Sequence, residues 1–278
     1  ERIIIISEVN MKNPVVIGCG NMGSAIIKAL LQQGIYTAEA FTIVEKQENS
    51  FARQLAEEKA VVLDRPDELH DSLDLVILAV KPQDSESVLR EIASKTNHET
   101  LVLSIMAGIS IGSMESQLPQ AQIIRCMPNT PCSVHQGMTV YCGNSRVSAS
   151  SFQLAQQILS AMGKAFQVTD EIMIDAATAI SGSGPAYVFY LAEALKEGAT
   201  RLGFTDEQSD LLATQTLLGA AELLNESPDS PEVLRRKVTS PGGTTEAALN
   251  YFTEKDLKEE LIKGFEVSFR RSLELGQK

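Results

Sequence analysis

The sequence predicts an α/β protein in which a doubly wound N-terminal domain precedes an all-α C-terminal domain. Short apolar, β-branched segments alternate with segments of helical spacing up to residue 168, and strand patterning is absent from Asp170 onward. A length of 278 residues corresponds to about two domains at roughly 150 residues each. We therefore expect one domain at residues 11–168 and another at 169–278, with residues 1–10 as a separate extension.

Eight segments of the first domain have the composition of strands. Continuous apolar runs such as Leu75–Val80 indicate burial on both faces, as in a parallel sheet that helices cover on both sides. The expected strands are Pro14–Gly18, Phe41–Glu45, Ala60–Leu63, Leu73–Val80, Leu101–Ile105, Ile123–Met127, Met138–Tyr141 and Ala165–Val168. The expected helices between them are Met22–Gln33, Glu48–Lys59, Ser85–Lys95, Ser110–Gln117 and Ser148–Met162.

The second domain carries helix start signals and apolar stripes. Thr205 and Gln208 have capping-box spacing, Ser230–Pro231 places proline at a first helical position, and Thr253 is expected to cap a helix from Glu254 onward. The last helix has apolar side chains every four residues, with others off that stripe, so more than one face is expected to be buried. We therefore expect a dimerisation domain, and a homodimer or a higher oligomer built from dimers.

Composition excludes several classes of function. Acidic residues outnumber basic ones by 36 to 24, and the formal net charge of −12 disfavours nucleic acids and anionic membranes as partners. The apolar runs are too short to cross a bilayer. The four cysteines show no CxxC spacing and no His cluster, so we expect reduced thiols, a cytoplasmic protein and no metal site. An anionic small molecule would need a locally positive or amide-rich site.

The strongest early motif is a glycine-rich loop between the first strand and the first helix. Its residues are Gly18, Cys19, Gly20, Asn21, Met22 and Gly23. The pattern GxGxxG in this context is typical of a Rossmann-like dinucleotide site, in which the loop and the helix start bind a pyrophosphate.

The end of the second strand bears on the choice of dinucleotide. Glu45 lies twenty-two residues past Gly23, where an acidic residue that binds the adenosine ribose is expected. A carboxylate there favours NAD, because it would repel a 2′-phosphate. Lys46 and Arg53 lie nearby and could neutralise such a phosphate, so the choice between NAD(H) and NADP(H) stays open.

Later strand ends are expected to complete the cofactor cleft, because ligands bind beyond the carboxyl ends of parallel strands. Asn129 and Thr130 stand between two prolines and offer polar groups to a carboxamide, whereas Lys81 is as readily explained as a surface charge. The cofactor residues expected at these turns are Ala79, Val80, Lys81, Pro82, Ala107, Gly108, Asn129 and Thr130.

Two glycine-rich segments interrupt the helical half. The first reads SGSGPAY, and Pro185 in it is expected to start a helix. The second reads SPGGTTE and runs from Ser240 to Glu246. Successive N–H groups at a helix start form a nest suited to a carboxylate, and two threonine hydroxyls stand beside it.

Taken together, GCGNMG, AVKP, MPNTP, SGSGPAY and KVTSPGGTTEAAL resemble the ordered motifs of the pyrroline-5-carboxylate reductase family, over nearly the whole chain from Met11. The resemblance implies reduction of Δ1-pyrroline-5-carboxylate to L-proline by NAD(P)H, the last step of proline biosynthesis. It also implies a dimerising helical domain with the active site near the subunit interface. Glu45 departs from the family pattern and puts its usual NADPH preference in doubt.

The resemblance also implies roles for single residues. Ser240, Gly243, Thr244 and Thr245 are expected to bind the substrate, whose carboxylate meets the amides of the last three. The Thr245 hydroxyl is expected to bond to the ring nitrogen and to position it, because a threonine is a poor general acid.

Two alternative functions account for less of the sequence. A dehydrogenase of the β-hydroxyacid type shares this domain order but depends on a catalytic lysine, and Lys196 and Lys237 lie in no matching motif. A nucleotide sensor without activity would have no use for the carboxylate nest at SPGGTT.

Overall fold

A computed structural model describes residues 12–276 of the chain. Contacts between the described residues divide them into two units, one that combines residues 12–183 with 268–276 and one of residues 184–267. We call them the first and the second unit. The sequence places a domain boundary after residue 168, where strands give way to helices, whereas the contacts between residues place it after residue 183. The boundary after residue 168 stays a prediction. Residues 1–10 lie outside the described part.

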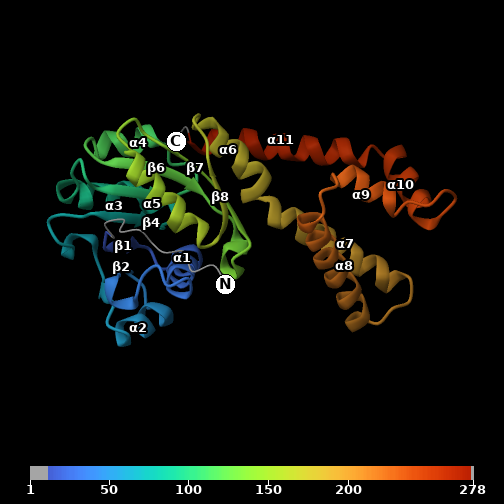
Figure 1. The fold of residues 1–278 in the computed structure, drawn as a ribbon, viewed down its shortest axis with the longest axis horizontal. Coiled ribbons are helices and arrows are strands. Elements are labelled where there is room, and N and C mark those ends of the chain that lie inside the picture. Colours follow the sequence, from blue (N-terminus) through green and yellow to red (C-terminus); the bar gives the residue numbers. More distant parts are fainter. Residues whose placement is uncertain (1–11, 277–278) are drawn as a thin grey trace. The chain divides into compact units, whose positions relative to one another are not determined.

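The first unit is built on one eight-stranded sheet in the order β3-β2-β1-β4-β5-β6-β7-β8 (Figure 1). All eight expected strands are present, as β1 Pro14–Ile17, β2 Thr42–Val44, β3 Val61–Leu63, β4 Leu75–Leu78, β5 Leu101–Ser104, β6 Gln122–Met127, β7 Gly137–Gly143 and β8 Gly163–Gln167. Strands β1 to β6 are parallel, but β7 pairs with β6 in the antiparallel sense. The connection between these two strands holds only the short turn Thr130–Val134, and a parallel return would need a longer crossover.

Helices cover both faces of this sheet, as the apolar strands predict. The helices are α1 Asn21–Gln32, α2 Ser50–Glu57, α3 Ser85–Ile92, α4 Ile111–Gln117, α5 Ala149–Ser160 and α6 Ile172–Ala177, which continues as a π-helical turn over Thr178–Gly182. Buried residues of α1, α2 and α5 form one apolar cluster with the sheet, while those of α3, α4 and α6 form a second.

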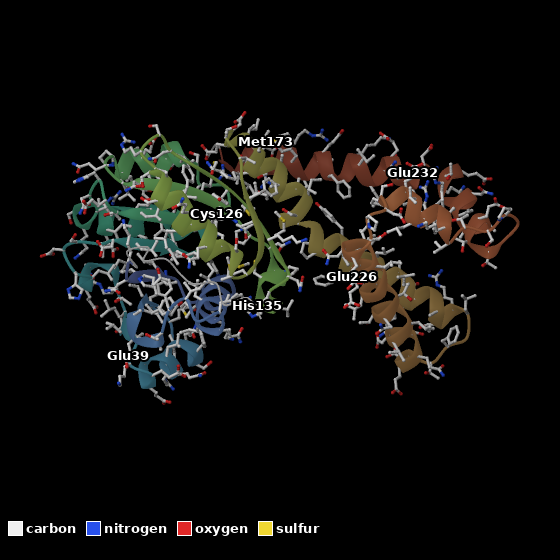
Figure 2. All side chains as sticks on the ribbon, viewed as in Figure 1. Glu39, Cys126, His135, Met173, Glu226 and Glu232 are labelled. Atoms are coloured by element: carbon white, nitrogen blue, oxygen red, sulfur yellow. The ribbon has the colours of Figure 1, made fainter. Side chains whose placement is uncertain are left out.

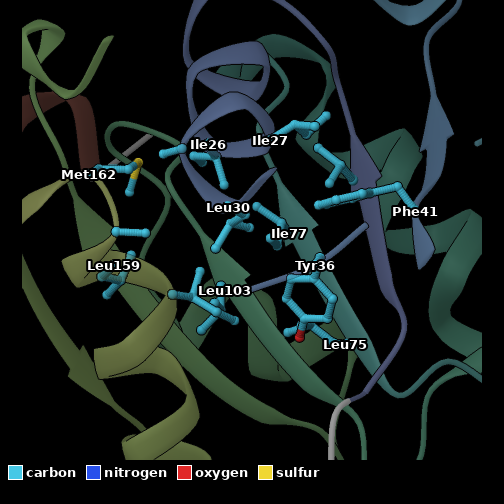
Figure 3. Packing of buried hydrophobic residues seen from close by; sticks show 14 of the residues in the cluster. Ile26, Ile27, Leu30, Tyr36, Phe41, Leu75, Ile77, Leu103, Leu159 and Met162 are labelled. Carbon is cyan, nitrogen blue, oxygen red and sulfur yellow. The ribbon is translucent and has the colours of Figure 1, made fainter. Parts of the chain in front are cut away.

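Alternate residues of a strand pack in the two different clusters. Val16 packs in the first and its neighbours Val15 and Ile17 in the second, as the period of two in a strand requires. Figure 3 shows Ile26 and Leu30 of α1 over the side chains of the central strands. Because helices cover both faces, the ends of the strands are where the sheet can present its backbone and side-chain groups to a ligand.

The second unit is helical throughout, as expected. It contains α7 Gly184–Arg201, α8 Asp206–Glu226, α9 Pro231–Lys237, α10 Thr244–Glu254 and α11 Leu257–Gly276, whose last turns, from Ser268, belong to the first unit. The capping box of Thr205 and Gln208 is present, and Ser230 caps α9 through the Val233 N–H.

One expected helix start is wrong. Thr253 lies inside α10, where its hydroxyl donates to the Leu249 carbonyl at 2.8 Å. The last helix instead begins at Leu257, directly after Asp256, which has a positive φ of 50°. Threonine can satisfy its hydroxyl on the preceding helical turn, so its presence alone does not fix a cap.

All four cysteines are buried free thiols. Cys126 lies on β6 in the interior of the first unit (Figure 2), and burial raises the pKa of its thiol. Among the described residues, no group of three His, Cys, Asp or Glu side chains is placed to hold a metal ion. No helix within residues 12–276 is long and apolar enough to span a bilayer.

Candidate cofactor site and substrate turn

A cavity of about 340 Å³ opens at the carboxyl ends of strands β1 to β4. The chain runs outward from β1 through β2 to β3 and then returns to place β4 on the other side of β1. This reversal is the switch point at which doubly wound sheets bind ligands. Seven of the expected cofactor residues line the cavity: Gly18, Gly20, Glu45, Lys46, Ala79, Val80 and Lys81.

The glycine-rich loop fits a dinucleotide. Gly18 has a φ of +96°, and a Cβ there would lie 2.7 Å from the Ala79 carbonyl oxygen. A Cβ on Gly23 would lie 2.0 Å from the Gly18 oxygen, so both positions require glycine. Gly20 faces open space, with no atom within 4 Å of an added Cβ. The loop therefore leaves room for a phosphate at the start of α1, where Asn21, Met22 and Gly23 form the first turn.

The Glu45 carboxylate is held by main-chain N–H groups. Its Oε2 accepts from the Cys19 N–H at 2.8 Å, and its Oε1 accepts from the Gln47 N–H at 3.0 Å. The Cys19 carbonyl in turn accepts from Asn49 Nδ2 at 2.6 Å and from Ser24 Oγ at 2.7 Å. Asn49 is also the N-cap of α2. The end of β2, the glycine-rich loop and α2 are thereby fixed to one another.

The two cations that left the choice of dinucleotide open both have acidic partners. Lys46 Nζ lies 2.7 Å from Asp84 Oδ1, and this hydrogen bond raises the pKa of Lys46. Arg53 pairs with Glu48 on the surface.

Five of the expected cofactor residues follow strands but do not line this cavity. Pro82 starts a 3₁₀ turn that leads into α3, and Ala107 is exposed after β5. Gly108 lies against the backbone of Leu275, with a φ of +73°. Asn129 donates to the Ser181 carbonyl at 3.0 Å and accepts from the Met138 N–H at 2.9 Å, while Thr130 is exposed. Contacts of these five with a cofactor stay predictions.

The SPGGTT turn lies in the second unit and leads into α10, with Gly243 as its N-cap. Gly242 donates its N–H to Glu246 Oε2 at 2.7 Å, and Gly243 donates to the Ser240 carbonyl at 3.0 Å. Thr244 and Thr245 are the first residues of the helix, where an N–H has no partner within the helix. Because the Gly243 N–H is already bonded to Ser240, the free amides of the expected set are those of Thr244 and Thr245.

Comparisons with known proteins place the chain in a family. Residues 171–275 match the family model described as pyrroline-5-carboxylate reductase dimerisation, and residues 15–108 match that described as NADP oxidoreductase coenzyme F420-dependent. The pyrroline-5-carboxylate reductase of Pseudomonas aeruginosa is 39% identical over 263 residues, which cover 94% of this chain and 96% of that protein. The chain belongs to the pyrroline-5-carboxylate reductase family.

Other members of this family agree in sequence and in structure. Human pyrroline-5-carboxylate reductase 2 is 34% identical, over 93% of this chain and 82% of its own length. The solved reductase of Coxiella burnetii superposes with a TM-score of 0.88 at 35% identity, over 97% of this chain and all of that one. The Plasmodium falciparum enzyme, solved with NADP bound, has a TM-score of 0.85 at 29% identity, over the same shares.

The alternative dehydrogenase is not favoured. A prephenate dehydrogenase structure from Aquifex aeolicus reaches a TM-score of 0.55 at 13% identity, which shows only a shared fold. The lysines considered for catalysis also have acidic partners: Lys196 lies 2.8 Å from Asp210, and Lys237 pairs with Asp229.

Several residues of the cavity are not indicated by the sequence motifs. Asp64 and Arg65 follow β3, so the strand-end rule that indicates Glu45 would also have found them. Asp84, Ser87 and Glu91 lie on or beside α3 at spacings of three and four, which places them on one helix face. The sequence shows that such a face exists but not that it borders the cofactor cleft.

Proposed function

We propose that this reductase-family chain converts Δ1-pyrroline-5-carboxylate to L-proline with NAD(P)H, the last step of proline biosynthesis. The observation that carries the proposal is 39% identity with a pyrroline-5-carboxylate reductase over 94% of the chain. The glycine-rich loop and the SPGGTT turn supply an anion site each, and both ligands of the reaction are anions.

The first unit would bind the cofactor. The amides at the start of α1 receive the pyrophosphate beside Gly20, and Glu45 receives hydroxyls of the adenosine ribose. Asn129 and Thr130 would receive the carboxamide, Asn129 through the amide hydrogen that is not bonded to Ser181. The nicotinamide, when bound, supplies the hydride.

The SPGGTT turn would bind the substrate. The free N–H groups of Thr244 and Thr245 would donate hydrogen bonds to its carboxylate, and Ser240 and Gly243 shape the turn through their main-chain hydrogen bond. The Thr245 hydroxyl accepts a hydrogen bond from the protonated ring nitrogen and so orients the imine. A protonated imine is already electrophilic, so positioning supplies much of the rate without a strong nucleophile or a metal.

The second unit would complete its core in an oligomer. Among its described residues only Ser209 and Ala213 are buried, whereas Phe189 and Tyr190 of α7 are 60% and 73% exposed. Patches of this kind mark protein interfaces, and the matched family model concerns dimerisation. We infer a homodimer, or a higher oligomer built from dimers. The four buried free thiols fit a cytoplasmic enzyme.

A tracer experiment tests the proposed reaction. NADH or NADPH labelled with deuterium at nicotinamide C4 is incubated with the protein and pyrroline-5-carboxylate, and proline is analysed by mass spectrometry. The cofactor is labelled on either one of the two faces of C4. We expect the label on one face, and not the other, to appear as a single deuterium on the former imine carbon of proline. Proline formation without transfer of label from either face, or no proline at all, would contradict the proposal.

A further inference from the structure

We propose that Glu45 makes NADH the preferred cofactor of this chain by excluding the 2′-phosphate of NADPH. The inference rests on the proposed function, because it concerns the cofactor of that reaction. It goes beyond the family, in which the solved Plasmodium falciparum enzyme is described with NADP bound. It is carried by the chain's own residues around the cavity at the ends of β1 to β4.

The position of the Glu45 carboxylate favours contact with a ribose. Glu45 directly follows β2, next to β1 and its glycine-rich loop, where an acidic side chain meets the ribose 2′-hydroxyl in doubly wound domains. Its two oxygens each accept one main-chain N–H, from Cys19 and from Gln47. A carboxylate has about four acceptor sites, so each oxygen can still accept a ribose hydroxyl.

Moving the Glu45 carboxylate away from this position would carry an energetic cost. Its partner Cys19 is 0% exposed, and Asn49 and Ser24 hold the carbonyl of the same residue. Rotation of Glu45 to admit a phosphate would leave the Cys19 N–H without its acceptor. The negative charge is therefore fixed where the 2′-phosphate, itself an anion, would have to lie.

Carboxylates outnumber cations in the lining of the cavity. Three cationic side chains line it, Lys46, Arg65 and Lys81, against four carboxylates, Glu45, Asp64, Asp84 and Glu91. Lys46 pairs with Asp84 and Arg65 with Asp67, both at 2.7 Å. Exposed pairs of this kind are weak and exchange readily. These ion pairs reduce the positive charge that is available to bind a 2′-phosphate, but the selection of NADH over NADPH depends on Glu45.

Calorimetric titration without substrate tests the proposal. The wild-type protein is titrated with NADH and with NADPH, and also with 5′-AMP and adenosine 2′,5′-bisphosphate, a pair that differs only in the 2′-phosphate. We expect NADH to bind at least about tenfold more tightly than NADPH, which is roughly the effect of one charge contact of 1.4 kcal/mol. We expect the two nucleotide fragments to differ in the same direction.

The variant Glu45→Gln removes the charge but keeps an oxygen to accept the Cys19 N–H. We expect the NADPH-to-NADH affinity ratio to rise about tenfold or more. The matched control is Glu86→Gln on α3, which removes the same charge from a side chain that does not line the cavity and pairs with Arg90 on the surface. Its affinity ratio should equal that of the wild type.

Two results would overturn the proposal: equal or tighter binding of NADPH by the wild type, or an unchanged ratio in a folded Glu45→Gln variant. If that variant does not fold, the wild-type fragment pair decides, because equal affinities of the two fragments would refute exclusion of the 2′-phosphate. These titrations contain no pyrroline-5-carboxylate, so their outcome is independent of whether the proposed reaction is correct.

Discussion

At the scale of single residues, both proposed anion sites rely on main-chain amides rather than on basic side chains. One lies at the start of α1 beside Gly20, and the other at Thr244 and Thr245 at the start of α10. Neutral donors of this kind bind a carboxylate or a phosphate without the desolvation cost of a buried lysine. In our proposals, side chains then add discrimination, Glu45 between the two cofactors and Thr245 for the substrate.

The role of Thr245 can be tested by removing its hydroxyl. We expect Thr245→Ala to lower kcat/KM for pyrroline-5-carboxylate by ten- to a hundredfold, because a hydrogen bond to a charged group contributes about 1.5–3 kcal/mol. Cofactor affinity, measured by titration, should change little. Thr245→Ser keeps a hydroxyl and should recover most of the activity. A collapse of cofactor affinity with unchanged substrate dependence would show that this turn is not the substrate site.

At the scale of elements, a buried ionic network ties β6 to α6 and to the last turns of α11. Arg125 on β6 has a side chain only 3% exposed, and its guanidinium lies 2.9 Å from Glu171 and 2.8 Å from Asp175 of α6. Asp175 also accepts from Ser272 in the last turns of α11 at 2.8 Å. The network therefore fixes the final turns of α11 to the sheet.

Removal of the cation should destabilise the protein strongly. Arg125→Met leaves two carboxylates without their partner, and breaking a buried pair in this way costs about 3–5 kcal/mol. Urea denaturation at one fixed protein concentration measures the loss of unfolding free energy. Arg90→Met removes an exposed i,i+4 pair with Glu86 and should cost less than about 1 kcal/mol. Equal losses of unfolding free energy in the two variants would mean that the buried network stabilises the protein no more than an exposed ion pair does.

Local patterns predict elements well where several signals agree, as at β1 and α1, where an apolar strand, the glycine-rich loop and an amphipathic helix follow one another. Side-chain alternation does not encode the antiparallel direction of β7, but the connection from β6 is too short for a parallel crossover and would have indicated it. The prediction of Thr253 as a helix cap was wrong because a threonine hydroxyl can also bond to a carbonyl within its own helix. In the site, Glu45 and Lys46 follow from strand ends, whereas Asp84 and Glu91 depend on how α3 packs, which is a tertiary property.

At the scale of the whole molecule, the net charge of −12 and the exposed apolar residues of the second unit have separate consequences. The charge opposes binding of anions in general, so binding of an anionic substrate and cofactor has to depend on local amides. The apolar residues of α7, such as Phe189 and Tyr190, indicate that an isolated chain leaves an interface uncovered.

The oligomeric state follows from this uncovered surface. Light scattering coupled to size-exclusion chromatography should give a mass of at least twice the chain mass of 30.1 kDa. The oligomer should persist on dilution into the micromolar range, because burial of the apolar side chains in the interface stabilises it. A monomer across that range would contradict the inferred dimer.

The most direct test of the central claim is a rate assay with each reduced cofactor. NADH or NADPH oxidation is followed with pyrroline-5-carboxylate as substrate, and NAD⁺ or NADP⁺ reduction is followed with 3-hydroxy acids as the competing class. We predict rapid cofactor oxidation that depends on pyrroline-5-carboxylate and yields proline, with no reaction of the hydroxy acids. Turnover of 3-hydroxy acids at comparable efficiency, or no oxidation with pyrroline-5-carboxylate, would contradict the assignment.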